Sequence, residues 1–499
     1  MADSHYLLGL DIGSSSIKAS LLDAENGHLV GSATSPSTEM PMQAPEPGWA
    51  EQHPEMWWDH VVTSVQEIIT RYKIVPAEIG AIGISYQMHG LVCVDKDQRV
   101  LRPGIIWCDS RAVEIGNEAF SLLGSEFCLS RLLNSPGNFT ASKLRWVQQF
   151  EPEIYSKIYK IMLPGDYIAM RLTGEINTTE SGLSEGIFFD FQKQSISSEL
   201  LEHYGIDKNL IPDIVPTFAV QGELTKEAAE ILGLKAGTKV AYRAGDQPNN
   251  AFSLNVMEPG EVAATAGTSG VVYGIIDKPS YDQQSRVNTF VHVNHQHNKP
   301  RYGVLLCVNG TGILNSWLKH NVAGPLDYNG MNQEAAEIAI GSDGVMVLPF
   351  GNGAERVLGN KDVGARFINF NFNRHTRSHL FRASQEGIVF ALNYGFQIMQ
   401  QMGLKLNVVR AGQANMFLSN IFKQTFANAT GATVQLINTD GAQGAARGAG
   451  LGAGIYKNRQ DAFRGLKTIE EIVPEQGQQD IYQNLYEKWQ QQLNSILKS

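Results

Sequence analysis

Cysteine is scarce in this chain of 499 residues, which holds four, Cys93, Cys108, Cys128 and Cys307. No C-x-x-C pair is present, and four cysteines in so long a chain do not form a disulfide framework. Such usage is typical of a protein from a reducing compartment, so the sequence predicts a cytoplasmic location.

Long hydrophobic runs are also missing. The longest apolar stretches, such as 344–350 and 303–308, are far shorter than the ~20 residues that a membrane-spanning helix needs. Residues 1–5 have no basic segment followed by an apolar run, so they do not resemble a secretory signal peptide. We therefore expect no membrane association.

Positive charge is in deficit, because 40 lysine and arginine residues face 50 aspartate and glutamate residues, for a formal net charge of −10. This balance argues against general affinity for nucleic acid or for an anionic membrane. It does not exclude a small anionic ligand, since backbone N–H groups and one lysine at a binding site can attract an anion more strongly than the net negative charge of the protein repels it. The length indicates two large domains, and the hydrophobic content of 43% is ample for two cores.

The two common nucleotide-binding loops are absent: there is no Walker A motif and no Gly-x-Gly-x-x-Gly after a strand. Instead, segments 8–18 and 263–272 each contain an apolar run, Gly-Ser-Ser or Gly-Thr-Ser, and a second apolar run. Both read as strand, tight turn and strand. Gly13 and Gly267 are about half the chain length apart, which indicates a duplicated architecture. Such turns expose N–H groups and hydroxyls to an anion, so two of them facing one cleft could hold a nucleoside triphosphate.

The rest of the chain reads as α/β, with a division near 247–260 that predicts domains over residues 1–250 and 251–499. In the first domain we expect strands at 6–12, 16–23 and 28–36, a helix at 54–71, and a helical insertion over 110–235 that caps the sheet. In the second we expect helices at 378–402, 416–430, 442–456 and 480–497, the last polar on most faces and on the surface. Glycines repeat through the helix at 442–456, which favours close helix packing over ligand contact.

Three segments together identify a family. Residues 11–18 (Asp-Ile-Gly-Ser-Ser-Ser-Ile-Lys), 245–247 (Gly-Asp-Gln) and 266–270 (Ala-Gly-Thr-Ser-Gly) resemble the FGGY carbohydrate kinases of the actin-like ATPase superfamily. The resemblance runs from about Leu7 to Ile455. It implies two duplicated actin-like (ribonuclease H-like) ATPase domains with an interdomain cleft, the first binding sugar and the second nucleotide. It also implies ATP and Mg²⁺ as partners.

Further segments narrow the resemblance. Residues 84–90 (Ile-Ser-Tyr-Gln-Met-His-Gly), 101–111 and 49–58 are similar to the members that phosphorylate D-xylulose, and 163–167 matches a family segment in the cap. The implied reaction is the ATP-dependent conversion of D-xylulose to its 5-phosphate. Two alternatives stay open: a kinase for another ketose or polyol (ribulose, fuculose or glycerol), and a non-catalytic actin-like sensor of sugar or nucleotide.

Two aspartates are the candidates for the chemistry. Phosphoryl transfer needs a carboxylate at the attacking hydroxyl, charge neutralisation and in-line positioning. The resemblance places the catalytic base at Asp246, although an aspartate before Pro248 could also cap a helix. Asp11, at the end of the first strand, is the candidate Mg²⁺ ligand, and the alternative is a turn-initiating residue.

The resemblance also assigns the ATP-binding residues. The β- and γ-phosphates would contact one turn through Gly13, Ser14, Ser15 and Lys18, and the other through Gly267, Thr268 and Ser269. Lys18 could instead be an exposed strand lysine. Segment 411–415 occupies the family's adenosine position with fewer glycines than usual, and its candidate contacts are Gly412, Gln413 and Asn415.

The candidate sugar contacts are Met88, His89, Gly90, Trp107, Asp109 and Gln247. An imidazole can both donate and accept hydrogen bonds, which suits a polyol, and an indole offers an apolar face to sugar C–H groups. Met88 could instead pack in the core, and Asp109 could cap the following helix.

His292, His295 and His297 form an H-x-x-H-x-H pattern that could indicate a transition-metal site. No carboxylate lies nearby in the sequence, so a solvated hairpin is the favoured interpretation. The expected partners are thus a sugar and ATP, with no nucleic acid, and a homodimer is left open.

Overall fold

The computed structural model describes residues 5–498 as two compact units. The first comprises 5–255, 290–302 and 439–466, and the second 256–289, 303–438 and 467–498. The division after Asn255 lies close to the expected boundary, but the two later returns of the chain to the first unit were not expected. Of the segment inspected for a signal peptide, residues 1–4 lie outside the described residues.

The first unit is built on a six-stranded sheet. Its strands, in spatial order, are β13 (Phe218–Glu223), β14 (Lys239–Gly245), β5 (Ile79–Tyr86), β1 (Tyr6–Ile12), β2 (Ile17–Asp23) and β3 (Leu29–Ser35). Strands β14, β5 and β1 are parallel neighbours, whereas β2, β3 and β13 are antiparallel to theirs. The central strands are apolar and buried, as strands covered on both faces are. The carboxyl ends of β1, β5 and β14 therefore share one edge.

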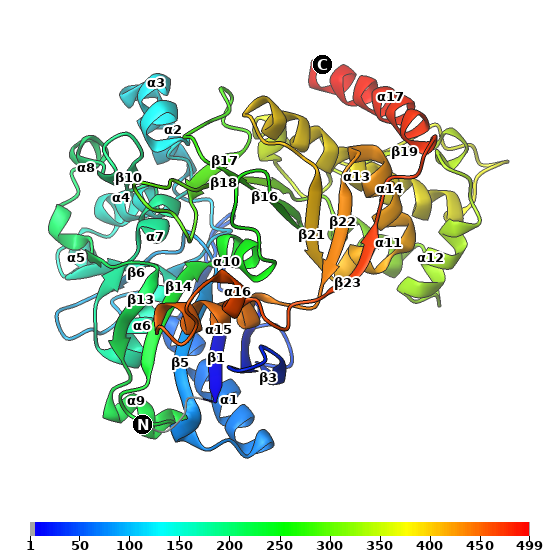
Figure 1. Cartoon of the computed structure of the whole chain (residues 1–499). Helices are drawn as coiled ribbons and strands as arrows, with labels where there is room; N and C mark the ends of the chain where they lie inside the picture. The colour runs from blue at the N-terminus through cyan, green and yellow to red at the C-terminus, as the bar shows by residue number, and fades with distance from the viewer. Residues whose placement is uncertain (1–4, 499) are drawn as a thin grey trace. The chain divides into compact units, whose positions relative to one another are not determined.

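Helices from distant parts of the chain cover the two faces of this sheet. Leu8, Leu10 and Ile12 of β1 share a core with helices α1 (Pro54–Tyr72) and α6 (Pro164–Thr173). Successive side chains alternate between faces, so Gly9 points the other way, onto α15 (Gly441–Gly452). Figure 1 shows α15 against β1 and β5, although more than 350 residues separate it from either strand.

Glycine makes this helix-to-sheet contact close. An ideal Cβ on Gly9 would lie 1.8 Å from the carbonyl oxygen of Ala442, and one on Gly83 would lie 2.0 Å from that of Ala445. Neither position can carry a side chain unless the helix moves away from the sheet. The glycine-rich helix is thus a packing element, as the sequence indicated.

The insertion over 110–235 is helical, as expected. Its helices include α2 (Val113–Leu123), α4 (Thr140–Phe150), α8 (Ser198–Tyr204) and α9 (Lys226–Leu232). Helices α6 and α7 (Glu180–Glu185) were not predicted. The short helices of the unit are α3 (Ser125–Phe127), α5 (Pro152–Tyr155), α10 (Asp246–Ser253) and α16 (Arg459–Ala462), and its minor strands are β4 (Glu51–Gln52), β6 (Val92–Val94), β7 (Gly104–Ile105), β8 (Lys160–Met162), β9 (Asn177–Thr178), β10 (Phe189–Asp190), β11 (Ser195–Ile196) and β12 (Asp213–Ile214).

The second sheet repeats the first. Its order is β17 (Asn288–Val291), β18 (Tyr302–Val308), β16 (Gly270–Ile276), β15 (Val262–Ala266), β21 (Val408–Gly412), β22 (Thr433–Ile437) and β23 (Thr468–Ile472). The antiparallel pair β15–β16 corresponds to β1–β2 of the first sheet. The parallel neighbours β21 and β22 correspond to β5 and β14, and the antiparallel strand β23 corresponds to β13. Both glycine-rich turns close the equivalent hairpin, so the predicted duplication is confirmed.

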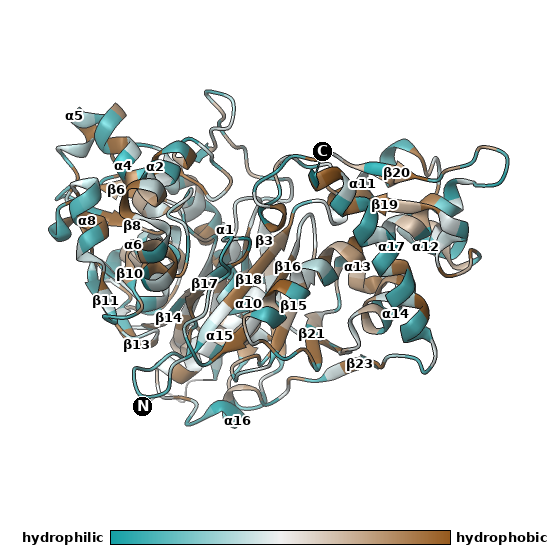
Figure 2. Cartoon of the chain, turned by 90° about the horizontal axis from the view of Figure 1, so that it is seen from above, coloured by the Kyte–Doolittle hydropathy of each residue, from teal (hydrophilic) through white to brown (hydrophobic). Residues whose placement is uncertain are grey.

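The helices of the second unit are α11 (Gly312–Asn321), α12 (Tyr328–Ala336), α13 (Arg377–Gln401), α14 (Asn420–Thr430) and α17 (Gln478–Lys498), with strands β19 (Met346–Leu348) and β20 (Arg366–Ile368). Apolar colouring marks strands β15 and β21 in Figure 2. No helix within residues 5–498 is both long and apolar enough to cross a membrane.

The last helix is less polar in its contacts than its sequence indicated. Four side chains of α17 at helical spacing are buried, Tyr482, Tyr486, Trp489 and Leu493. Trp489 is fully buried and donates its indole N–H to the carbonyl of Val347 at 2.8 Å. The helix therefore has one face in the core and is a surface helix only on its other sides.

Candidate active site

Three predicted motifs meet at the carboxyl edge of the first sheet. In the ladder, Ile12 of β1 pairs with Tyr86 of β5, and Tyr86 pairs with Gly245 of β14. The residues that follow these strands are the turn at 13–16, the segment 87–90, and Asp246. Because the strands are parallel neighbours, the structure brings the three together.

Asp246 is the first residue of α10, directly after β14. The cap position belongs to Gly245, so the alternative in which the Asp246 side chain caps this helix is wrong. Burial and the nearby charge of Asp11 raise the pKa of Asp246 from 3.8 to about 7. Gln247, the other residue of this motif, donates from Nε2 to Asp246 Oδ2 at 3.2 Å and partly opposes the shift. A carboxyl that titrates near neutrality suits a general base.

Asp11 lies at the end of β1, on the face that meets α15. An ideal Cβ on Gly441 would lie 2.4 Å from Asp11 Oδ2, so only glycine leaves room for this carboxylate. Burial raises the pKa of Asp11, and the charge of Asp440 adds to the shift. Asp11 thus has Asp246 and Asp440 as anionic neighbours. Such a concentration of carboxylate oxygens fits a hard divalent cation, which would relieve their repulsion.

Lys18 takes part in an ion pair and is not an isolated strand lysine. Its Nζ lies 2.6 Å from Asp440 Oδ2, and Asp440 also caps α15 by accepting from Gln443 N at 2.9 Å. The sequence analysis missed Asp440, although an aspartate before a glycine-rich helical run is a recognisable N-cap signal. Contact between Lys18 and phosphate stays a prediction.

The first turn also meets a residue predicted for a different ligand. Gly13 N donates to Ser16 O at 3.1 Å and closes the turn, beside Ser15. The indole N–H of Trp107 donates to Ser14 Oγ at 3.2 Å, and 47% of Trp107 is exposed. The structure therefore places a candidate phosphate contact next to a candidate sugar contact.

The segment after β5 presents its backbone to a buried carboxyl. His89 has a left-handed backbone (φ 47°), and its N–H donates to Glu185 Oε1 at 3.3 Å. Its ring lies edge-on to Phe139 at 4.9 Å between centroids. Met88 is buried against Gly245, where an ideal Cβ would lie 2.7 Å from Met88 Cγ. At Gly90 a Cβ would meet Pro164 at 2.6 Å.

Glu185 is a site residue that the sequence analysis missed. It is the last residue of α7, it is fully buried, and an ideal Cβ on Gly245 would lie 2.3 Å from its Oε2. Burial raises the pKa of Glu185 well above its usual range, and the charges of Asp246 and Asp166 add to the shift. The carboxyl group of Glu185 lies beside Gly245, the residue that precedes Asp246. A glutamate in a six-residue helix gave no signal in the sequence.

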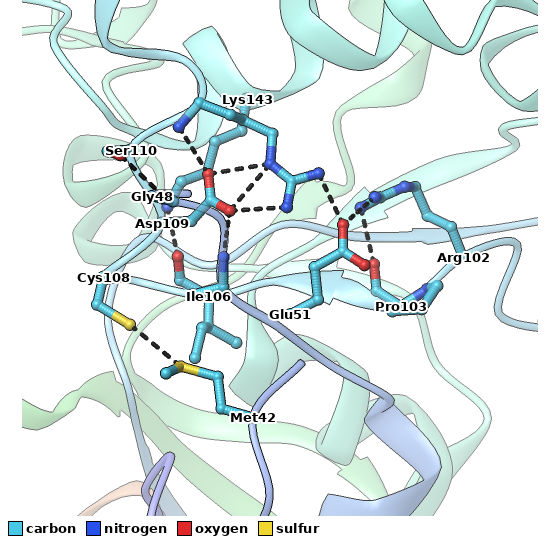
Figure 3. Close-up of polar contacts among 12 residues, drawn as sticks. Met42, Gly48, Glu51, Arg102, Pro103, Ile106, Cys108, Asp109, Ser110 and Lys143 are labelled. Atoms are coloured by element: carbon cyan, nitrogen blue, oxygen red, sulfur yellow. Dashed lines mark hydrogen bonds and ion pairs between the residues drawn. The ribbon is translucent and has the colours of Figure 1, made fainter. Parts of the chain in front are cut away.

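Asp109 has local partners that account for its burial. It is fully buried and accepts from Ala50 N at 2.6 Å and from the Arg111 guanidinium at 2.7 Å. The guanidinium carbon of Arg111 lies 3.9 Å from the ring centre of Trp49. Asp109 also accepts from Arg111 N at 2.9 Å, but the N-cap of the following helix α2 is Ala112 and no side chain caps it, so the capping alternative is wrong. Figure 3 shows Asp109 in this network near Glu51. Contact of Asp109 with a ligand stays a prediction without support from this geometry.

Lys143 is a second missed residue, and it holds two of the site's loops. Its buried Nζ donates to the carbonyl of His89 at 3.0 Å and to that of Ile106 at 2.9 Å. Burial lowers the pKa of Lys143 to about 8, against the opposing charge of Asp109. The loops that carry His89 and Trp107 are thus fixed to one ammonium group.

In the second unit, two predicted motifs share another sheet edge. Strands β15 and β21 are parallel neighbours, so the turn after β15 and the segment after β21 lie together. The atom nearest to an ideal Cβ on Gly267 is Asn415 Nδ2, at 3.4 Å. The carbonyls of Gly267 and Thr268 accept from the N–H groups of Gly312 and Ile313 at 2.9 and 3.0 Å. The structure thus groups the candidates Gly267, Thr268, Ser269, Gly412, Gln413 and Asn415. Their position opposite the first turn stays a prediction.

The expectation that the histidine-rich segment has no carboxylate partner is wrong. Glu180 Oε1 lies 2.9 Å from His297 Nε2. The glutamate comes from α7, 117 residues earlier in the chain, so no local pattern could have revealed it.

Comparison with known proteins gives a consistent result. Residues 6–253 match the model of the N-terminal domain of the FGGY family of carbohydrate kinases, and residues 262–455 match that of its C-terminal domain. The chain is 27% identical to the xylulose kinase of Bacillus subtilis (strain 168), with 99% of both chains covered. It is 28% identical to the L-xylulose/3-keto-L-gulonate kinase of Escherichia coli (strain K12), with 98% of this chain and 96% of that one covered. The crystal structure of xylulose kinase from Rhodospirillum rubrum is 26% identical, with a TM-score of 0.86 over 99% of this chain and 100% of that one.

Proposed function

Because the chain belongs to the FGGY family of carbohydrate kinases, we propose that it transfers the γ-phosphoryl group of ATP to the primary hydroxyl of D-xylulose. The observation that carries this proposal is the carboxylate of Asp246, which follows a buried strand at the same edge as the turn at 13–16 and His89. The family supports ATP as the donor. The names of the relatives and the segment 84–90 support a ketopentose as the acceptor.

In the proposed mechanism, Asp246 accepts the proton of the primary hydroxyl. The oxygen so activated forms a bond to the γ-phosphorus while the bond to the β,γ-bridging oxygen breaks, and ADP leaves. Mg²⁺, held by Asp11, would neutralise charge on the phosphates. His89, Trp107 and Gln247 would orient the sugar, together with Met88 and Gly90.

The same proposal assigns the nucleotide contacts. The turns at 13–15 and 267–269 would donate backbone and hydroxyl hydrogen bonds to the phosphates, with Lys18 adding charge. The segment 412–415 would hold the adenosine. Closure of the two units over both ligands would exclude water, so that the phosphoryl group passes to the sugar rather than to solvent. A need for ATP, and four cysteines that form no disulfide in the described part of the chain, favour a cytoplasmic location.

A panel of acceptors tests this function. Purified protein is assayed with ATP and Mg²⁺ in a coupled ADP-release assay against D-xylulose, L-xylulose, ribulose, fuculose and glycerol. We expect the highest kcat/KM for D-xylulose. A higher value for another acceptor would replace the substrate but keep the reaction. Absence of sugar-dependent ADP release with the whole panel would favour a non-catalytic sensor.

The rate should depend on pH through Asp246. Its pKa of about 7 means that the carboxylate form predominates only above neutrality. The free enzyme should therefore lose kcat/KM about tenfold per pH unit below pH 7, because the base becomes protonated. A profile of kcat/KM against pH from 5 to 9 measures this. A rate that is flat down to pH 5 would contradict an Asp246 base of raised pKa.

Replacing Lys143 by methionine should raise the KM for the sugar about tenfold with a smaller change in kcat. Methionine is unbranched and only one heavy atom shorter than lysine, but it has no N–H to donate. The carbonyls of His89 and Ile106 therefore lose their hydrogen bonds, at a cost of about 1–3 kcal/mol each if they remain buried. Steady-state kinetics over a range of sugar concentration separate the two parameters. The matched control is Lys160→Met, which also removes a lysine bonded to a backbone carbonyl, that of Ile211 at 2.9 Å, but touches neither loop. Equal effects of both variants would exclude a positioning role for Lys143.

A further inference from the structure

We propose that Glu180, His295 and His297 bind a divalent transition-metal ion, with Zn²⁺ the preferred one, at a site separate from the catalytic edge. One ligand atom from each of the three residues lies within 4.8 Å of the others. Two imidazoles and one carboxylate are a common set of protein ligands for zinc. Imidazole ligands do not suit Mg²⁺, so the site differs in kind from the one at Asp11.

Each of the three side chains forms a hydrogen bond through an atom that can also coordinate a metal ion. Glu180 Oε1 lies 2.9 Å from His297 Nε2, and His295 Nε2 lies 3.0 Å from Gln194 Oε1. A metal ion would replace the proton in these contacts. Gln194 is then close enough to supply an oxygen as an outer partner or a fourth ligand, and water can complete the shell.

The ring of His295 is held in a way that suits coordination. Its Nδ1 lies 3.3 Å from the carbonyl oxygen of Arg301 and 3.2 Å from the N–H of the same residue. The backbone of Arg301 can therefore support either tautomer. When Nδ1–H donates to the carbonyl, Nε2 presents its lone pair to the metal, which is the usual arrangement around a ligating histidine.

His295 is only partly exposed to solvent. His297 is more exposed, with 60% of its side chain accessible, so a metal can reach the site from solvent.

The ion would fasten the segment 290–302 to helix α7. Hydroxyl groups already join them at the other end of the contact, because Ser181 Oγ donates to Val291 O and Val291 N donates to Ser184 Oγ, each at 2.9 Å. Helix α7 begins at Glu180 and ends at Glu185, whose carboxyl group lies beside Gly245, the residue before Asp246. The role we assign to the metal is therefore structural: it stabilises the helix that supports the site.

The test is metal binding by the full-length, tag-free protein after treatment with a chelator. Zn²⁺ is titrated by calorimetry in the presence of excess Mg²⁺, which saturates oxygen-only sites. Co²⁺ is titrated in parallel by visible absorption. We expect one Zn²⁺ per chain, a Co²⁺ spectrum typical of low coordination number, and a rise in Tm with added Zn²⁺.

Two variants and one control decide the result. His297→Ala and Glu180→Gln should each weaken Zn²⁺ binding about tenfold or more and remove the rise in Tm. His320→Ala removes an exposed histidine of α11 that hydrogen-bonds only within its own turn, and it should change neither. No saturable Zn²⁺ binding by the wild type, or binding that both variants retain unchanged, would overturn the proposal. Because the readouts need no turnover, this outcome is independent of whether the chain phosphorylates D-xylulose.

Discussion

Asp246→Asn should lower kcat about 10²- to 10⁴-fold, the range that loss of a general base produces, while the sugar still binds. Asparagine keeps the shape of the side chain and its contact with Gln247 but cannot accept the proton of the hydroxyl. Single-turnover rates and a sugar Kd from calorimetry separate chemistry from binding. Asp97→Asn, on an exposed turn, serves as the matched control and should turn over normally. Near-normal kcat in Asp246→Asn would remove this residue from the mechanism.

The same substitution has a second readout that does not depend on activity. The folded state binds the Asp246 proton up to about pH 7, whereas the unfolded state releases it near 3.8. The folded state therefore holds more protons between these values, and the free energy of unfolding falls as the pH rises through them. Asparagine has no such proton. We expect Tm to fall less between pH 5 and pH 7.5 in Asp246→Asn than in the wild type.

Gly9→Ala should destabilise the protein by about 3 kcal/mol or more, because the added methyl group would overlap the backbone of α15, which has no alternative rotamer as a side chain would. The added carbon would lie 1.8 Å from the oxygen of Ala442, so α15 must leave the sheet. Urea unfolding gives the free energy, and the yield of soluble protein gives a first indication.

Gly330→Ala is the control for this effect. Gly330 lies in α12, and an added Cβ would meet mainly the flexible side chain of Leu326, at 3.1 Å. Alanine also favours a helix by about 1 kcal/mol over glycine, so this variant should be neutral or slightly stabilised. A loss in Gly9→Ala no larger than that in Gly330→Ala would mean that the helix-to-sheet contact is looser than described.

Local patterns were enough to predict much of the fold. The two turns around Gly13 and Gly267 indicated the duplication, because each turn lies between short apolar strands. Glycines at 441–454 indicated close packing, but nothing local revealed that β1 and β5 are the partners. The helix expected at 480–497 was predicted to be polar on most faces, and the spacing of Tyr482 and Trp489 on one face was overlooked.

For the candidate site too, short sequence motifs could be predicted, whereas contacts between distant segments could not. Asp11 and Asp246 were found because each belongs to a short motif at the end of a buried strand, and the family resemblance assigned the role of Asp246. Glu185, Lys143 and Asp440 contact those motifs from other segments of the chain. The sequence around a residue does not show which distant residues contact it in the fold. These three residues could be recognised only once the pairing register of the parallel strands and the position of α15 on the sheet were known.

The position of α15 also bears on how the chain acquires its structure during synthesis. When residue 255 has left the ribosome, one face of the first sheet is still bare at Gly9 and Gly83, because its covering helix has not been made. Residues 256–289 and 303–438 of the second unit are translated before that helix emerges. A fragment ending at 255 should therefore be insoluble or captured by chaperones, and the first unit completes its folding only after most of the second unit has been translated.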